Sequence, residues 1–143
     1  RYNWKKKDFE EEISNSKFDP KTKQAIENLM EFTKEMMPSE WEGTWHQFFG
    51  GTGKSPMFFG YLSKIHENQS LYEINSITGE LIIKFWSLNA KPKLLERFLD
   101  ECSKNNFEDI VDTYYKRPRS SSSVSDWANR VDEFTRILKE VFS

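Results

Sequence analysis

The period of the apolar residues changes twice along this chain, and that change restricts the fold more than any other feature. Before Pro38 and after Pro92, apolar residues recur every three or four positions, as on one face of a helix. Between Glu40 and Leu88 they alternate or form short runs, which is typical of strands. We therefore expect an α+β fold, in which a small antiparallel sheet of three to four strands is flanked by N- and C-terminal amphipathic helices.

Start and stop signals mark the helical segments. Asp19 and Pro20 are a typical N-cap and first-turn proline, and Pro38 ends the helix that they begin. Residues 123–126 have the form of a cap before the last helix. The helices expected from these signals and from the apolar spacing are 4–13, 20–37, 92–102, 107–115 and 127–141.

Segments 43–49, 57–64, 71–75 and 80–88 have the pattern of strands. Thr78 and Gly79, between the last two, are typical of a tight hairpin turn. In the last segment Ile83 faces one way and Trp86 the other, so both faces of the sheet have apolar surface to bury. We expect helices on at least one face.

A length of 143 residues fits a single domain that spans the whole chain. Residues 116–123 are the one low-complexity stretch, and we interpret them as a mobile basic and serine-rich loop. The sequence begins with Arg1 and not with Met, which suggests a domain excised from a longer protein.

Composition limits the partners and the compartment. A net charge of -2 excludes a globally basic nucleic-acid binder and leaves only local basic patches. The single cysteine, Cys102, excludes an internal disulfide framework. No apolar run approaches the length of a membrane span. We expect a cytoplasmic protein without a membrane partner.

Residues 50–55 look at first like a nucleotide-binding loop. Such a loop needs a glycine five residues before its Gly-Lys-Ser, and this position is Phe48. The residues after Ser55 form an extended aromatic run, whereas a phosphate loop opens a helix. We therefore expect no nucleotide hydrolysis. Backbone amides at Gly51 and Gly53 remain a candidate anion-binding loop, with a plain hairpin turn as the alternative.

No pattern in the sequence indicates catalysis. His46 and His66 each lack a second metal ligand at helical spacing, and Cys102 lies on an apolar helical stripe. Glu80 and Lys84 are four residues apart, whereas the Glu-x-Lys of restriction-type nucleases spaces them by two. We expect a protein that is not an enzyme and that needs no metal or cofactor.

A candidate binding surface lies between Glu42 and Glu67, where no acidic residue occurs but cations and aromatic rings alternate. This is the combination that base stacking and phosphate contact require. A second basic cluster follows Tyr115. The candidate nucleic-acid-binding residues are Trp45, Lys54, Tyr61, Lys64, Lys116, Arg117 and Arg119. The alternatives are that most of these rings belong to the core and that the second cluster is an ordinary solvated loop.

Several short motifs resemble a poorly characterised prokaryotic accessory domain that occurs with restriction-type nuclease and other DNA-defence domains. The motifs are Tyr2-Asn3-Trp4, Gly51-Thr52-Gly53-Lys54-Ser55, Ile77-Thr78-Gly79-Glu80-Leu81, Leu94-Leu95 and Asp126-Trp127. The resemblance implies helices around a small antiparallel sheet and a DNA-related context. It brings no catalytic residues.

These observations favour a non-catalytic recognition module that binds DNA or another nucleic acid on behalf of an attached nuclease domain. The competing hypothesis is a protein-interaction domain, such as an immunity protein or antitoxin. Its candidate acidic surfaces are Asp8 with Glu10, Glu11 and Glu12, or Glu96 with Asp100 and Glu101.

Overall fold

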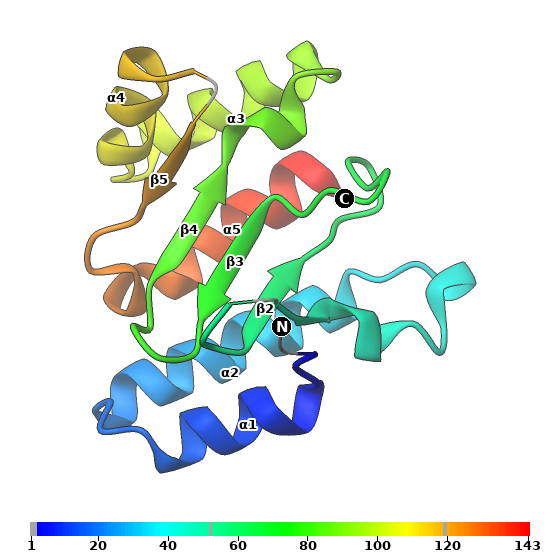
Figure 1. The fold of residues 1–143 in the computed structure, drawn as a ribbon. Coiled ribbons are helices and arrows are strands. Elements are labelled where there is room, and N and C mark those ends of the chain that lie inside the picture. The colour runs from blue at the N-terminus through cyan, green and yellow to red at the C-terminus, as the bar shows by residue number, and fades with distance from the viewer. Residues whose placement is uncertain (1–2, 52, 119) are drawn as a thin grey trace.

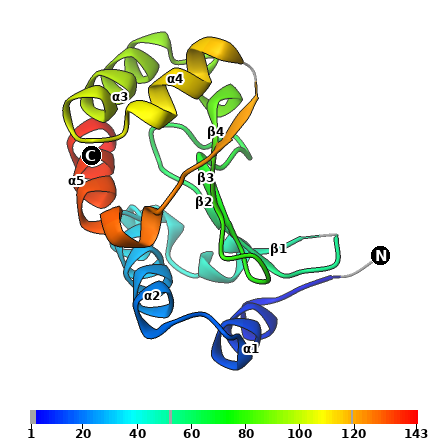
Figure 2. The same ribbon diagram turned by 90° about the vertical axis from the view of Figure 1, so that its left-hand side faces the viewer.

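The helices lie against one face of an antiparallel sheet, and the other face is open (Figures 1 and 2). The computed structural model describes residues 3–51, 53–118 and 120–143. Within them the chain forms five α-helices and five strands. The α+β class is confirmed, whereas three to four strands was an underestimate. No described helix is both long enough and apolar enough to cross a membrane.

The α-helices are α1 (Lys6–Asn15), α2 (Pro20–Glu35), α3 (Pro92–Lys104), α4 (Glu108–Lys116) and α5 (Val131–Phe142). All five expected helices are present. The carboxylate of Asp19 caps α2 by accepting the Thr22 N–H at 2.7 Å, and this hydrogen bond lowers the pKa of Asp19. Asp126 makes no such cap. A 3₁₀ turn, Trp127–Arg130, leads into α5 instead.

The strands are β1 (Phe49–Gly50), β2 (Met57–Gly60), β3 (Tyr72–Asn75), β4 (Leu81–Lys84) and β5 (Ser121–Ser123). They follow one another in the sheet in chain order, and all pairs are antiparallel.

Several segments differ from the expected strands. Of 57–64 only Met57–Gly60 is a strand, and the second half of 80–88 is a 3₁₀ helix, Phe85–Leu88. Most of 43–49 is a 3₁₀ helix, Trp45–Phe48, because Thr44 O accepts the Gln47 N–H at 2.8 Å in a local turn. Ser121–Ser123, inside the stretch interpreted as a loop, pairs with β4. Serine has little strand propensity, but the free edge of β4 supplies backbone partners and Ser122 is buried.

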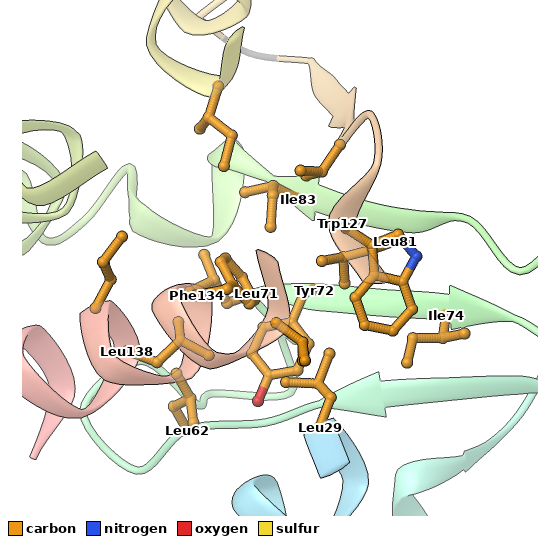
Figure 3. Packing of buried hydrophobic residues seen from close by; sticks show 14 of the residues in the cluster. Leu29, Leu62, Leu71, Tyr72, Ile74, Leu81, Ile83, Trp127, Phe134 and Leu138 are labelled. Carbon is orange, nitrogen blue, oxygen red and sulfur yellow. The ribbon is translucent and has the colours of Figure 1, made fainter. Parts of the chain in front are cut away.

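The face of the sheet that α2 and α5 cover holds the core (Figure 3). Tyr72, Ile74, Leu81 and Ile83 point into it and are fully buried. Tyr72 packs edge-to-face on Phe134 of α5, with centroids 5.9 Å apart. Its hydroxyl lies 2.6 Å from Thr33 Oγ1 of α2. This contact ties the sheet to the helix layer.

The opposite face, turned toward the viewer in Figure 1, carries no helix. Burial alternates along β2, β3 and β4, so that every second side chain is only partly buried. Phe59, Glu73, Ile82 and Lys84 are the partly buried members of these strands that neighbour one another on this face.

Candidate functional site

Six side chains form an unbroken line across the open face and past its edge, and we call this line the aromatic track. Its members, in spatial order, are Trp41, His66, Tyr61, Phe59, Lys84 and Trp86. All are at least partly exposed. From the Trp41 end, successive ring centroids are 4.9, 5.5 and 6.3 Å apart. Lys84 Nζ then lies 5.3 Å from the Phe59 centroid and 5.7 Å from that of Trp86.

The pleat of the sheet explains the middle of the aromatic track. Side chains two residues apart on a strand point to the same face. Phe59 in β2 and Lys84 at the end of β4 therefore lie on the open face. Tyr61 comes directly after β2, and Trp86 lies in the 3₁₀ helix Phe85–Leu88 that follows β4. Glu73 in β3 pairs with Phe59 on one side and with Ile82 on the other, so it lies between the two strands that carry the track.

The ammonium group of Lys84 is neutralised within the sheet. Its Nζ lies 2.7 Å from Glu73 Oε2 and donates to Ser70 Oγ at 3.0 Å. The two charged side chains are only 16% and 17% exposed. The centre of the aromatic track thus consists of rings around an ion pair without net charge. Any positive charge that the track offers to a ligand must come from its two ends.

The phenol of Tyr61 is held neutral. Burial raises its pKa, and the nearby Glu73 carboxylate raises it further. The ring meets Phe48 and His66 edge-on, at 86° and 79°, and also contacts Phe59. Tyr61 therefore joins the open face to the hollow beyond its edge.

That hollow, which we call the edge pocket, has a volume of about 120 Å³. Its lining residues are Trp41, Thr44, Gln47, Phe48, Tyr61, His66 and Asn68. His66 Nδ1 accepts the Asn68 backbone N–H at 3.3 Å, so the neutral imidazole carries its proton on Nε2.

Of the rings expected to bind, Tyr61 is in the aromatic track and Trp45 is not. Trp45 packs against Phe49 and Phe58 on the helix side of the sheet, with centroids 5.3 and 5.8 Å apart. Lys34 of α2 lies 5.8 Å from its ring. Trp45 and Tyr61 both contact buried Phe48, at 4.9 and 5.2 Å between ring centroids, but Trp45 is not part of the aromatic track.

Gly51 follows β1 and residues 53–56 precede β2, and the two strands pair antiparallel. Gly51 has a φ of +113°, which favours glycine, and the Gly53 carbonyl accepts Trp4 Nε1–H at 3.0 Å. Lys54 is exposed. It precedes β2, whereas Tyr61 follows β2, so the two lie toward opposite ends of that strand.

The other expected cations lie near the two ends of the aromatic track. Exposed Lys64 shares a shallow pocket with Trp41 and His66, which Glu40 and Glu67 also line. Within the described residues Lys64 forms no ion pair.

Lys116 and Arg117 are exposed at the end of α4, and neither forms an ion pair with a described residue. The Arg117 carbonyl accepts the Ser120 N–H at 3.1 Å, and the Ser120 carbonyl accepts that of Phe85 at 3.3 Å. The basic segment is thus hydrogen-bonded to the strand end that precedes Trp86. Arg119 lies outside the described residues.

Five members of the track were not among the candidate site residues: Trp41, Phe59, His66, Lys84 and Trp86. Lys84 and Trp86 are two residues apart in the segment expected as a strand, and this signal was available, although in the structure Trp86 lies in the 3₁₀ helix after β4. The signal was interpreted as a second buried face, whereas Trp86 is 38% exposed.

A second hollow lies between α1 and α2, with a volume of about 400 Å³. Phe9, Ile13, Ile26, Met30 and Trp45 give it an apolar floor, and lysines and glutamates from both helices alternate around its rim. Of the acidic α1 residues, Glu10 pairs with Lys6 at 3.2 Å.

The described side chains that were considered for catalysis or metal binding do not form a reactive site. Cys102 is fully buried, and this burial raises the pKa of its thiol, so the thiol stays protonated. Among the described residues, no group of three or more His, Cys, Asp or Glu side chains could hold a metal ion.

A comparison with protein-family models found none that matches this chain, and comparisons with curated proteins and with solved structures gave no match either.

Proposed function

We propose that this chain is a non-catalytic recognition module that binds single-stranded nucleic acid, with DNA as the expected ligand, along the aromatic track. The observation that carries the proposal is the continuity of the track, in which no step between neighbours exceeds 6.3 Å. Every base has a π-face, so a row of partly exposed rings binds successive bases with little regard to sequence. Stacking contributes about 1–3 kcal/mol per base.

The cations at the ends of the aromatic track complete the surface. Lys64 lines a pocket with Trp41 and His66. Lys116 ends α4, and Arg117 is linked through the Ser120 backbone to Phe85, the residue before Trp86. Unpaired cations are available to contact phosphates without first breaking an ion pair. A strand that stacks on the rings would therefore have its backbone held at both ends.

Single strands suit this surface better than a duplex. A duplex keeps its bases stacked on one another and presents phosphates, so its binding depends on many cations. This chain has a net charge of -2, and its central Lys84 is neutralised by Glu73. The main binding groups of this surface are therefore aromatic rings, and these rings stack only on bases that are not already stacked in a duplex.

The resemblance to an accessory domain found with nucleases agrees with this proposal. Nuclease and defence systems produce and process single-stranded ends, and a module that holds such an end would serve a catalytic domain attached to it or bound by it.

Fluorescence anisotropy with a labelled oligonucleotide, measured over a series of salt concentrations, tests the proposal. Single-stranded DNA should bind more tightly than a duplex of the same sequence. With three phosphate contacts, the logarithm of the association constant should fall against the logarithm of salt concentration with a slope of roughly -2. Absence of binding at low salt, or equal affinity for the duplex, would contradict it.

Two double variants that lose the same charge distinguish a phosphate contact at the site from a general effect of net charge on DNA binding. Lys116→Ala/Arg117→Ala should reduce the steepness of the salt dependence by roughly 1.4, because two phosphate contacts are lost. Lys17→Ala/Lys21→Ala removes the same charge from exposed residues around the start of α2 and should leave the slope unchanged.

A protein partner is the second candidate, and the hollow between α1 and α2 favours it. An apolar floor with a charged rim is suited to an amphipathic segment of another chain. Glu11 and Glu12 of α1 are exposed but line a separate hollow with Trp4 and Asp8.

Glu27→Lys/Glu31→Lys reverses two charges at the rim of that hollow. Loss of a copurifying protein in this variant, with no DNA binding by the parent chain, would favour the second candidate over the first.

A further inference from the structure

The edge pocket, at the Trp41 end of the aromatic track, is enclosed by rings on several sides. Trp41 and Tyr61 both meet His66 edge-on, at interplanar angles of 64° and 79°, and buried Phe48 lies beneath Tyr61 at 86°. Rings at steep angles to one another form walls, whereas a stacked pair would close the space between them.

The size of the edge pocket restricts its occupant. Its volume of about 120 Å³ is well below the roughly 300–1,000 Å³ of pockets that hold drug-sized ligands. One small ring system fits it, and a larger molecule does not.

Two of the polar side chains that line the edge pocket are amides. Within the described residues, the side chains of Gln47 and Asn68 make no hydrogen bond, although both line the pocket. Each amide offers one acceptor and two donors, the pattern that complements the edge of a base. His66 Nε2–H adds a donor.

The lining residues of the edge pocket include no carboxylate. Aromatic cages that hold organic cations gain from negative potential around the rings. Uncharged amides with edge-on rings instead match a neutral planar ring that carries hydrogen-bonding groups, as bases that are splayed out of single strands do.

We propose that the edge pocket takes one unstacked base of the bound strand and hydrogen-bonds its edge through Gln47 and Asn68. This inference rests on the proposed function, because Tyr61 belongs both to the aromatic track and to the pocket. It adds one position of base selection to a surface that otherwise binds without regard to sequence.

Photocrosslinking tests this inference. Oligonucleotides with 5-iodouracil at one position are irradiated with the protein, and the adducts are mapped by mass spectrometry. We expect adducts on Trp41, His66 or Tyr61, together with adducts on Phe59 or Trp86 from bases on the open face.

The outcomes separate the two proposals. Adducts on Phe59 and Trp86 alone would overturn the edge pocket and leave the track intact. No adducts, together with no binding by anisotropy, would overturn the proposed function itself. Thymidine monophosphate that binds as tightly as the oligonucleotide would overturn the assignment of the pocket to a base within a strand.

Gln47→Ala should weaken oligonucleotide binding about tenfold, the equivalent of one lost hydrogen bond of roughly 1.4 kcal/mol. It should also abolish the adducts at Trp41 and His66. Gln69→Ala is the matched control, since Gln69 is equally exposed, lies next to Asn68 and does not line the pocket. Equal affinity of Gln47→Ala and the parent chain would contradict the role of the amide.

Discussion

The ring of Tyr72 occupies the space that a side chain at Gly60 would need. A Cβ built on Gly60 would lie 2.0 Å from Tyr72 Cε1, and the two residues pair across β2 and β3. Tyr72 cannot retreat, because its ring is fully buried and its hydroxyl is bonded to Thr33.

Gly60→Ala should therefore destabilise the fold by about 1–3 kcal/mol, the usual effect of overpacking a core. Urea denaturation measures this. Gly53→Ala is the control, since nothing lies within 4 Å of its Cβ position, and it should change stability by less than about 0.5 kcal/mol. Equal midpoints for the two variants would show that the Tyr72 ring moves freely.

The Thr33–Tyr72 hydrogen bond predicts unequal effects for its two partners. Thr33 Oγ1 donates to Leu29 O at 2.7 Å, so the Tyr72 hydroxyl must be the donor to Thr33. Thr33→Val leaves that hydroxyl buried without a partner and should cost about 1–3 kcal/mol, whereas Tyr72→Phe leaves Thr33 bonded and should cost less. Urea denaturation of both single variants and of the double variant tests this asymmetry, and a double variant less stable than Thr33→Val would contradict it.

Alkaline pH should destabilise the protein through its buried phenols. Burial raises the pKa of Tyr72 and of Tyr61 above the ordinary value of 10.0. Above pH 10 these phenols ionise in the unfolded chain before they ionise in the folded one, so their contribution to stability is complete below that pH and is lost as the pH rises. Urea midpoints between about pH 8 and 11 should decline less steeply in Tyr72→Phe than in the parent chain, and identical declines would contradict the assignment.

Trp86→Ala should weaken single-stranded DNA binding by the stacking energy of one base, about 1–3 kcal/mol or roughly 5- to 150-fold. Trp86 is only 38% exposed, so the truncation also removes packing, and binding is compared well below the thermal midpoint of the variant. Ile77→Ala is the control, because Ile77 is also apolar and exposed but lies in the turn after β3, outside the aromatic track. Anisotropy titrations that give both variants the same affinity would contradict the track.

Glu73→Gln should strengthen DNA binding. The substitution removes the partner that neutralises Lys84 at 2.7 Å and gives the centre of the aromatic track a free cation. One added phosphate contact steepens the salt dependence by about 0.7. Glu80→Gln changes the net charge equally at an exposed residue whose carboxylate accepts a hydrogen bond from Ser123, and its slope should not change. An equal gain in DNA affinity in both variants would show that the effect comes from the change in net charge alone.

The helices and the order of the elements could be predicted because their signals are local. Asp19 with Pro20 begins α2 through one hydrogen bond three residues away, and the apolar stripe of α5 needs no knowledge of its neighbours. β5 could not be predicted, since Ser121–Ser123 is a strand only because β4 offers it a free edge.

The binding surface could be predicted only in part for the same reason. Trp45 and Trp86 both lie within predicted strands, and nothing local says which ring a helix will cover. α2 brings Lys34 over Trp45, whereas Trp86 lies in the 3₁₀ helix after β4 and is 38% exposed. Tyr61 was found because it lies in the acid-free segment, and Lys84 was missed because its partner Glu73 comes from another strand.

The sheet ends on both sides in its shortest strands, β1 with two residues and β5 with three. A neighbouring molecule that approaches either border finds only a few backbone groups with which to extend the ladder. Short edge strands of this kind oppose fibril growth. The aromatic face of the sheet can therefore stay uncovered without the molecules polymerising through their own strands.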